Sequence, residues 1–448
     1  RYIFRHALLR DAAYSMQLLT RQQELHALAV SAMETLYEHE LRPHYGELAY
    51  HAERANLVEK ALLYLPLAAK LAASAYQNKQ AVNYFSRALD LTPLENLQAQ
   101  FNLLMARAKL YGLMGERKMQ AQDLDKLERL SLQINKDGLL ARIWMMRADY
   151  AYTISDYQNA LEKAQQALDF AQSSDAEEVA LDSYRISSLA LIRQGKLEDA
   201  MQQAQEGLQL VRRLGKRIEE GKILNSVGLI ALEQKEPTNA QAYLEEALSI
   251  ARETGNRGLE TKSLNNLGTS AGLIQDDYVA AREYYEQANL IARERGDRTL
   301  QSATLGNMGW AAGMQGDFDF AHVCHEQALS LAREVGERYQ EANTLCNLSS
   351  VAIVRMEADA ALQFANQANN LARKIGERSC EAWSLLYMGY AFLLAHDYVK
   401  SRSAFHQAIR VSKIAQPNLI PEAIAGLILL ALEIDDLPAA SRETEKIL

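Results

Sequence analysis

Apolar positions recur along most of the chain at spacings of three and four residues, as on one face of an α-helix. In "LETKSLNNLGTSAGLI" the apolar or small positions that share one face are Leu264, Leu267, Gly268 and Ala271. After a polar turn, "DYVAAREYYEQANLIARERG" forms a second such face with Ala281, Tyr284, Tyr285, Ala288 and Ile291. The pattern predicts a first helix, the A helix, followed by a second helix, the B helix.

This two-helix unit repeats. A Gly-X-Arg motif returns at steps of 40 or 41 residues, with its glycine at Gly215, Gly255, Gly296, Gly336 and Gly376. A small residue follows in each A helix at Gly228, Gly268, Gly309, Ser349 and Gly389. We interpret the Gly-X-Arg glycines as helix ends in the left-handed conformation. The extra residue of one 41-residue step falls in the turn "IQDDY", where repeat proteins tolerate insertions.

A second column of small residues extends the period over most of the chain. Its members are Ala81, Ala121, Ala160, Ala200, Ala240, Ala281, Ala321, Ala361, Ser401 and Ala440. The column predicts about ten helix pairs, each too small to bury its own apolar face without stacking on its neighbours. We therefore predict an all-α fold, an α-solenoid.

The units resemble the tetratricopeptide repeat in its longer variety of about 40 residues. The likeness rests on Leu-x-x-Leu-Gly, a turn, Ala-x-x-Tyr/Phe and Ala-Leu, as in "TLGNMGWAAGMQGDFDFAHVCHEQALSLAREVGER". Similar units occur in Pins/LGN scaffolds, kinesin light chains and the maltose regulator MalT. The resemblance implies a right-handed superhelix over residues 43–448, clearest at 176–412, whose A helices line a concave groove.

Residues 1–42 carry a separate resemblance. "FRHALLRDAAY", from Phe4 to Tyr14, resembles the junction between a STAND or AAA-type NTPase module, often linked to a cyclase or kinase, and a repeat array. The chain also begins with Arg1 and not with a methionine. We therefore expect an upstream effector domain that acts in cis with this chain. No GxxxxGK[ST] motif occurs in the sequence, so we expect no P-loop here.

Composition narrows the function classes. The formal charge of −9 argues against a nucleic-acid binder, because phosphate contacts need a basic face. The longest apolar run, "IAGLILLAL", is about half of what a spanning helix needs, so we expect no membrane insertion. Three cysteines without CxxC spacing indicate neither a disulfide framework nor a zinc site and favour a cytoplasmic protein.

One metal-like motif occurs, "HVCH" at His322, Cys324 and His325. Cys324 occupies the inward column of Tyr284, and two histidines supply too few ligands for tetrahedral zinc. We predict no metal, no cofactor and no catalytic group, and hence no enzyme in this chain.

Polar residues recur on the A helices beside the apolar face. These amides are Asn225, Asn265, Asn266, Asn307 and Asn347. In the resembled repeats this side faces the groove, where an amide can donate to and accept from a peptide backbone. The alternative is that the amides brace neighbouring repeats.

Two lysines, a further amide and three aromatic residues lie on the same side and complete the predicted peptide groove: Lys222, Lys262, Asn343, Trp310, Tyr387 and Tyr390. Lysines beside amides suit an acidic peptide, and aromatic rings suit anchor positions. The motif arginines Arg217, Arg257, Arg298, Arg338 and Arg378 could also bind carboxylates bidentately. The alternative for these arginines is structural, as helix caps or partners of nearby glutamates.

We therefore predict a non-catalytic scaffold or sensor arm of a signalling protein that binds a protein or peptide in its groove. One alternative is a small-molecule-sensing arm of a STAND-type regulator, with an enclosed pocket. Another is an architectural module for self-association. The sequence sets no oligomeric state.

Overall fold

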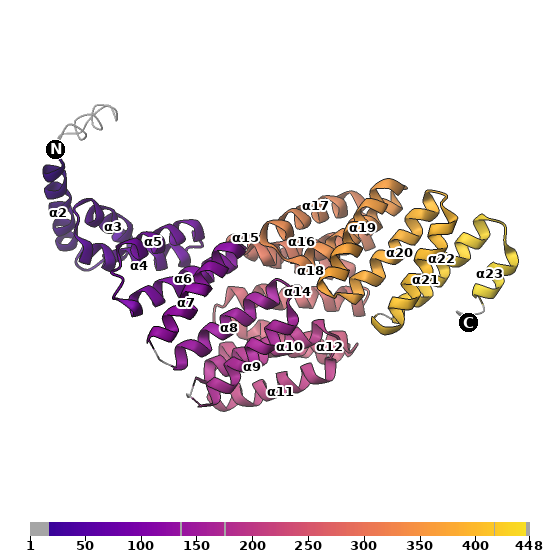
Figure 1. The fold of residues 1–448 in the computed structure, drawn as a ribbon, viewed down its shortest axis with the longest axis horizontal. Coiled ribbons are helices and arrows are strands. Elements are labelled where there is room, and N and C mark those ends of the chain that lie inside the picture. Colours follow the sequence, from indigo (N-terminus) through magenta and orange to yellow (C-terminus); the bar gives the residue numbers. More distant parts are fainter. Residues whose placement is uncertain (1–17, 135–136, 174–175, 416, 445–448) are drawn as a thin grey trace. The chain divides into compact units, whose positions relative to one another are not determined.

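The computed structural model describes residues 18–134, 137–173, 176–415 and 417–444 (Figure 1). Those residues are helical or lie in short turns, and they contain no strand. They divide into unit 1, residues 1–136, and unit 2, residues 137–448. The predicted junction motif from Phe4 to Tyr14 lies outside the described residues. The all-α solenoid prediction is confirmed.

Unit 1 contains six α-helices and one 3-10 helix among its described residues: α2 (Leu19–Leu36), η1 (Arg42–His44), α3 (Tyr45–Arg54), α4 (Val58–Ser74), α5 (Asn78–Leu91), α6 (Leu97–Met114) and α7 (Arg117–Ile134). Glu34 joins α2 to α4, because it accepts a hydrogen bond of 2.7 Å from the Tyr64 hydroxyl. Arg107 of α6 binds Asp123 of α7 through two hydrogen bonds of 2.7 and 2.8 Å. Polar bridges thus supplement a core rich in alanine and leucine.

Unit 2 continues as alternating A and B helices. The A helices are α8 (Asp137–Thr153), α10 (Glu177–Arg193), α12 (Arg217–Glu233), α14 (Arg257–Ile274), α16 (Arg298–Met314), α18 (Arg338–Val354), α20 (Arg378–Leu394) and α22 (Ile420–Glu433). The B helices are α9 (Tyr157–Ser173), α11 (Leu197–Leu214), α13 (Pro237–Glu253), α15 (Tyr278–Glu294), α17 (Phe318–Val335), α19 (Ala358–Ile375), α21 (Tyr398–Ala415) and α23 (Leu437–Thr444). A short 3-10 helix, η2 (Pro417–Leu419), precedes α22. With α4/α5 and α6/α7 of unit 1, the described residues form ten consecutive helix pairs.

The Gly-X-Arg glycines end the B helices as predicted. All five have positive φ, between 61° and 76°, which glycine adopts without a steric cost. The amide that follows the glycine bonds back to the last turn, as Asn256 does to the Ala251 carbonyl at 2.8 Å. This residue is also the N-cap of the next A helix, and the side chains of Asn256 and Asp297 accept from its first-turn amides. The motif is therefore a helix stop and restart.

The inserted residue lies in the turn between α14 and α15. There the Asp277 amide bonds to the Ala271 carbonyl, six residues back. In the next repeat the corresponding bond joins Asp317 to Ala312, five residues back. The turn therefore absorbs the extra residue while both helices keep their register.

In four helix pairs of unit 2, a glycine of the A helix faces a large side chain of the B helix. A Cβ on Gly268 would lie 2.7 Å from the Tyr285 ring, and one on Gly389 would lie 2.5 Å from the Phe405 ring. Where Ser349 replaces glycine, Ala365 occupies the column of the large residue and is fully buried. The Ser349 hydroxyl donates to the Ala361 carbonyl at 2.9 Å. The small side chain of Ala365 thus leaves room for the serine at this contact.

The small B-helix column is buried as predicted, with one correction. In α7 the buried position is Gln120, which is 5% exposed, and not the neighbouring Ala121. The Gln120 amide lies against Gly112 and accepts a hydrogen bond of 2.9 Å from Arg117. A glycine in α6 makes room for the longer side chain, so the small residue has moved to the other helix.

A matched pair in α16 tests this packing. Gly309→Ala would place a Cβ 2.8 Å from the His325 ring, whereas Gly313→Ala meets only Ala321, at 3.8 Å. We expect the first change to cost about 1–3 kcal/mol of unfolding free energy through overpacking. The second should gain up to about 1 kcal/mol, because it replaces a glycine in the last turn of α16 and restricts the unfolded chain. Urea unfolding followed by circular dichroism measures both, and equal effects would contradict the packing account.

The buried His325 ring should make the protein acid-sensitive. Burial lowers the pKa of His325 to about 4, with a smaller effect from His322. A depressed histidine pKa means that its contribution is fully present above the unfolded pKa and is lost as pH falls from about 6.5 towards 4. The difference corresponds to at most about 3 kcal/mol.

His325→Phe, which resembles the Phe405 contact, should flatten the dependence of the thermal midpoint on pH between 7 and 4. Substitution of the exposed His406 by phenylalanine serves as the control and should leave the slope unchanged. A slope that survives in His325→Phe would assign the acid sensitivity to other groups.

Candidate functional site

The A helices of unit 2 form a continuous layer. Each A helix from α8 to α22 contacts the next A helix directly, whereas successive B helices touch little or not at all in the described part of the chain. The layer whose helices touch is the inner side of a curved stack, because curvature crowds one layer and spreads the other. We call the surface of the A helices that faces away from the B helices the inner face.

Amides on the inner face bond across repeats. The Asn266 amide donates to the Asn225 carbonyl oxygen at 3.3 Å, and the Asn307 amide donates to the Asn265 carbonyl oxygen at 3.0 Å. Ser263 also contacts Asn225, at 3.4 Å. These bonds join α12 to α14 and α14 to α16, so the bracing role that the sequence left open is observed for four of the predicted asparagines.

Two further amides on this face lack such partners. Asn343 and Asn347 are half-buried on α18 and make no side-chain hydrogen bond to any described residue. Asn347 occupies the column of Asn307, whose amide bonds to Asn265 of the preceding repeat, but in the repeat that precedes Asn347 the position of Asn265 is taken by Gly306. The donors and acceptor of each remain open for a ligand.

Charged side chains of both signs gather on α10, α12 and α14. Lys222 pairs with Glu219 at 2.8 Å, and Arg185 pairs with Asp182 at 3.3 Å. Lys262 makes no hydrogen bond or ion pair within the described residues. Its side chain reaches water, yet the surrounding protein desolvates it and lowers its pKa.

The surroundings of Lys262 also show how the inner face curves. The next cause of its lowered pKa is Arg185 of α10, two helix pairs earlier, and Asp149 of α8 acts in the opposite direction. Groups from well-separated repeats therefore approach one another over the inner face. The local spacing of the sequence does not reveal Arg185 or Asp149 as members of this cluster.

The three predicted aromatic anchors all have intramolecular partners. Trp310 lies against Gly272, where a Cβ would be 2.6 Å from its ring, and packs edge-on against Tyr278 at 5.7 Å. The Tyr390 hydroxyl donates to the Glu422 carbonyl at 3.0 Å and thereby joins α20 to α22. Tyr387 stacks on Trp383 at 5.6 Å, and burial raises the pKa of its hydroxyl. Ligand contact by these rings stays a prediction.

The motif arginines form a repeated bridge around each Gly-X-Arg turn. Glu381, which is buried, accepts from Arg378 at 2.8 Å and faces Arg373 of the preceding B helix at 3.4 Å. The same arrangement joins Arg212 and Arg217 to Glu220, and Arg252 and Arg257 to Glu260. One carboxylate thus links the end of a B helix to the start of the next A helix.

The remaining two motif arginines differ from this arrangement. Arg298 pairs with Glu334, and Arg338 makes no ion pair within the described residues. The structural alternative is therefore observed for Arg217, Arg257, Arg298 and Arg378. Carboxylate binding by this line stays a prediction, for which Arg338 is the available guanidinium.

A contact between distant repeats escaped the sequence reasoning. The guanidinium of Arg193, at the end of α10, lies 3.9 Å from the ring centroid of Tyr339, at the start of α18. Four helix pairs separate these residues along the chain. No periodic signal connects them, because the contact depends on how far the stack of helices has turned.

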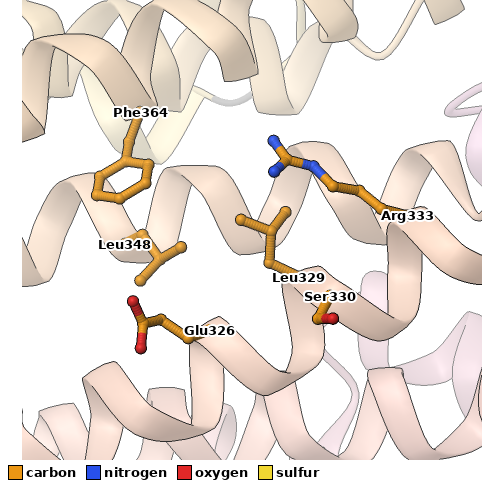
Figure 2. Close-up of a pocket in the computed structure, with 6 residues that line it drawn as sticks. All are labelled: Glu326, Leu329, Ser330, Arg333, Leu348 and Phe364. Carbon is orange, nitrogen blue, oxygen red and sulfur yellow. The ribbon is translucent and has the colours of Figure 1, made fainter.

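A cavity of about 300 Å³ lies on the other side of the A-helix layer, between α17 and α19. Figure 2 shows Leu329, Leu348 and Phe364 at the cavity, with Glu326 and Arg333 at its opposite ends. Arg333 spans to Gln367 of α19 through a hydrogen bond of 2.8 Å. None of the predicted groove residues lines this cavity.

The "HVCH" residues point apart. His322 faces Glu326 at 3.4 Å, whereas His325 is buried against Gly309. Burial raises the pKa of the Cys324 thiol to about 11. Within the described residues no cluster of three metal-ligating side chains occurs. Nor is any helix of that part both long and apolar enough to cross a bilayer.

The repeat geometry agrees with comparisons to known proteins. A family model of the tetratricopeptide repeat matches residues 219–288 and 259–334. This part of the chain consists of tetratricopeptide repeats. The matched residues include the inner-face amides of α12, α14 and α16.

Several solved structures share the fold at low identity. A Rap protein complexed with competence and sporulation factor matches 79% of this chain and 99% of its own, with TM-score 0.51 and 12% identity. The apo quorum sensor NprR from B. thuringiensis matches 79% and 98%, with TM-score 0.52 and 14% identity.

A STAND protein with a tetratricopeptide repeat sensor, PH0952 from Pyrococcus horikoshii, matches 80% of this chain with TM-score 0.53 and 14% identity. This chain spans about half of that protein, 53% of its length. No curated relative matches the sequence.

The two kinds of inner-face amide should differ in their effect on stability. Asn307→Ala removes the hydrogen bond to Asn265 and should cost about 1 kcal/mol of unfolding free energy. Asn347→Ala removes no intramolecular bond and should change stability by less than about 0.5 kcal/mol. Urea titration of the two variants side by side measures the difference. An equal loss in both would show that Asn347 also braces a neighbour.

Proposed function

We propose that unit 2 is the sensor arm of a signalling protein and binds an extended peptide on its inner face. The observation that carries the proposal is the pair of amides without partners, Asn343 and Asn347, on a layer whose other amides are internally bonded. Asparagine in a helix interior carries a propensity cost, and bracing accounts for that cost only where a partner exists. A peptide backbone supplies the matching donors and acceptors.

Charge favours a peptide with an acidic residue. Lys262 has no internal partner and lies in a desolvating environment, where a carboxylate would compensate its charge. Lys222 and Arg185 lie on adjacent A helices, although each already has a carboxylate partner. A single acidic side chain therefore fits this cluster better than a strongly acidic segment.

The fold comparisons support a peptide in a signalling role. One tetratricopeptide structure with this fold holds competence and sporulation factor, and another is a quorum sensor. A third is the sensor of a STAND ATPase. By analogy with that arrangement, binding on the inner face would bias an effector domain in cis between two states, through its different affinity for the two states.

The test uses an equimolar library of random hexapeptides with the purified chain, and the retained peptides are identified by mass spectrometry. Dissociation constants of the retained peptides are then measured for the parent and for Asn343→Ala/Asn347→Ala. We expect a loss of about tenfold or more in the double variant, since each lost hydrogen bond is worth about 1 kcal/mol. Asn370→Ala, at an exposed position of α19 on the B-helix side, is the control and should bind as the parent does.

Two outcomes would overturn the proposal. If no hexapeptide is retained and a compound from a metabolite collection raises the thermal unfolding midpoint of the chain, a small-molecule sensor is favoured instead. Equal affinity in the parent and the double variant would show that the peptide does not bind to Asn343 and Asn347 on the inner face of α18.

A further inference from the structure

We propose that Arg193 and Tyr339 form a clasp that closes one turn of unit 2. The inner face then admits a single extended peptide, threaded from an end, and not a segment held on the surface of a folded protein. This inference rests on the proposed peptide-binding function, and it specifies the kind of partner and its route of entry. The clasp joins α10 to α18, which lie four helix pairs apart in the chain.

The contact has the geometry of a cation–π pair. The guanidinium carbon of Arg193 lies 3.9 Å from the centroid of the Tyr339 ring, well within the 6 Å range of this interaction. The Tyr339 ring is fixed on its own side, because it packs against the core of Ala342, Ala372 and Cys380. On the other side, Arg193 interacts electrostatically with Tyr152 of α8 and Tyr157 of α9.

Several neighbouring groups show that the helices around Arg193 and the helices around Tyr339 meet over an area and not at a single point. Tyr157 of α9 is 8% exposed and interacts electrostatically with both Arg193 and Glu377. Glu377, the N-cap of α20, is 6% exposed and interacts with Arg193 and with Glu233 of α12. Residues of α9, α10 and α12 therefore face residues at the starts of α18 and α20.

Burial at this position varies among the Gly-X-Arg turns. Lys216 is exposed, Asn256 and Glu337 are half-buried, and Asp297 and Glu377 are buried. Glu377 differs in its surroundings, because its electrostatic neighbours Arg193 and Glu233 come from α10 and α12 of earlier repeats.

The clasp has a steric consequence for the ligand. Because the A helices from α10 to α18 are joined in sequence by direct contacts, a contact between the first and the last of them completes a closed circuit. Lys262 of α14, in the middle of this series, interacts electrostatically with Arg185 of α10 and Asp149 of α8. A ligand on the inner face of α10 to α18 must therefore enter through an end of this circuit, or after the contact between Arg193 and Tyr339 opens.

The closure is tested first without any ligand. Nitroxide labels are placed at Lys196→Cys and Lys374→Cys, two exposed positions on either side of the clasp, and their separation is measured by pulsed electron resonance in the full chain. The three native cysteines are buried. We expect one narrow distance distribution in the parent and in Tyr339→Phe, which keeps the ring.

Arg193→Ala should lengthen and broaden this distribution. Arg213→Ala, which removes an exposed arginine of α11, is the matched control and should leave it unchanged. A distribution in Arg193→Ala identical to that of the parent, in a variant whose circular dichroism is unaltered, would overturn the clasp.

The second measurement tests the class of ligand. Hexapeptides retained by the parent are compared as free peptides and as the same sequences inserted in a surface loop of a folded carrier protein. We expect the parent to bind the free peptides at least tenfold more tightly, and Arg193→Ala to reduce this difference to less than threefold. Equal binding of free and loop-displayed peptides by the parent would overturn the threading route. If no hexapeptide is retained, the peptide-binding function fails, while the label distances still decide whether the clasp exists.

Discussion

The close approach of each A helix to its B helix is the constraint on which the rest of the solenoid depends. Gly268 and Gly389 leave no room for a Cβ because an aromatic ring from the B helix occupies that space. Ser349 is accommodated because Ala365 replaces the ring. This contact fixes the rotation of both helices, so the opposite face of every A helix is directed to the same side of the stack. The inner face exists because this rotation is repeated.

The polar groups of unit 2 fall into two sets with different tasks. Around the turns, buried carboxylates such as Glu381 connect consecutive helix pairs. On the inner face, Asn225, Asn266, Asn265 and Asn307 join neighbouring A helices in pairs. This pairing stops at α18, where the amide of Asn347 has no matching partner. The candidate site is thus formed by those polar side chains of the inner face that have no hydrogen-bond partner among the described residues.

The sequence predicted the features that arise within one repeat. The helix pairs, the positive φ of Gly336 and its equivalents, and the turn with the inserted residue all follow from local periodicity. It placed the buried column of α7 at Ala121 instead of Gln120, because a glycine in α6 compensates for the longer side chain. The clasp of Arg193 and Tyr339 could not be predicted, since it depends on the angle accumulated over four helix pairs.

Ser349 in the A helix and Ala365 in the B helix together replace the glycine and the large side chain that meet in other repeats. The packing of this repeat therefore depends on one residue from each of its two helices. A duplication or recombination with its joint at a Gly-X-Arg turn keeps the two residues together, and the joined segments retain matched volumes. A joint in the turn between an A and a B helix separates them. It would bring Ser349 against a bulky side chain such as Tyr285, or leave Gly268 facing an alanine across an empty space. The heritable module of this array is therefore the A helix with the B helix that follows it.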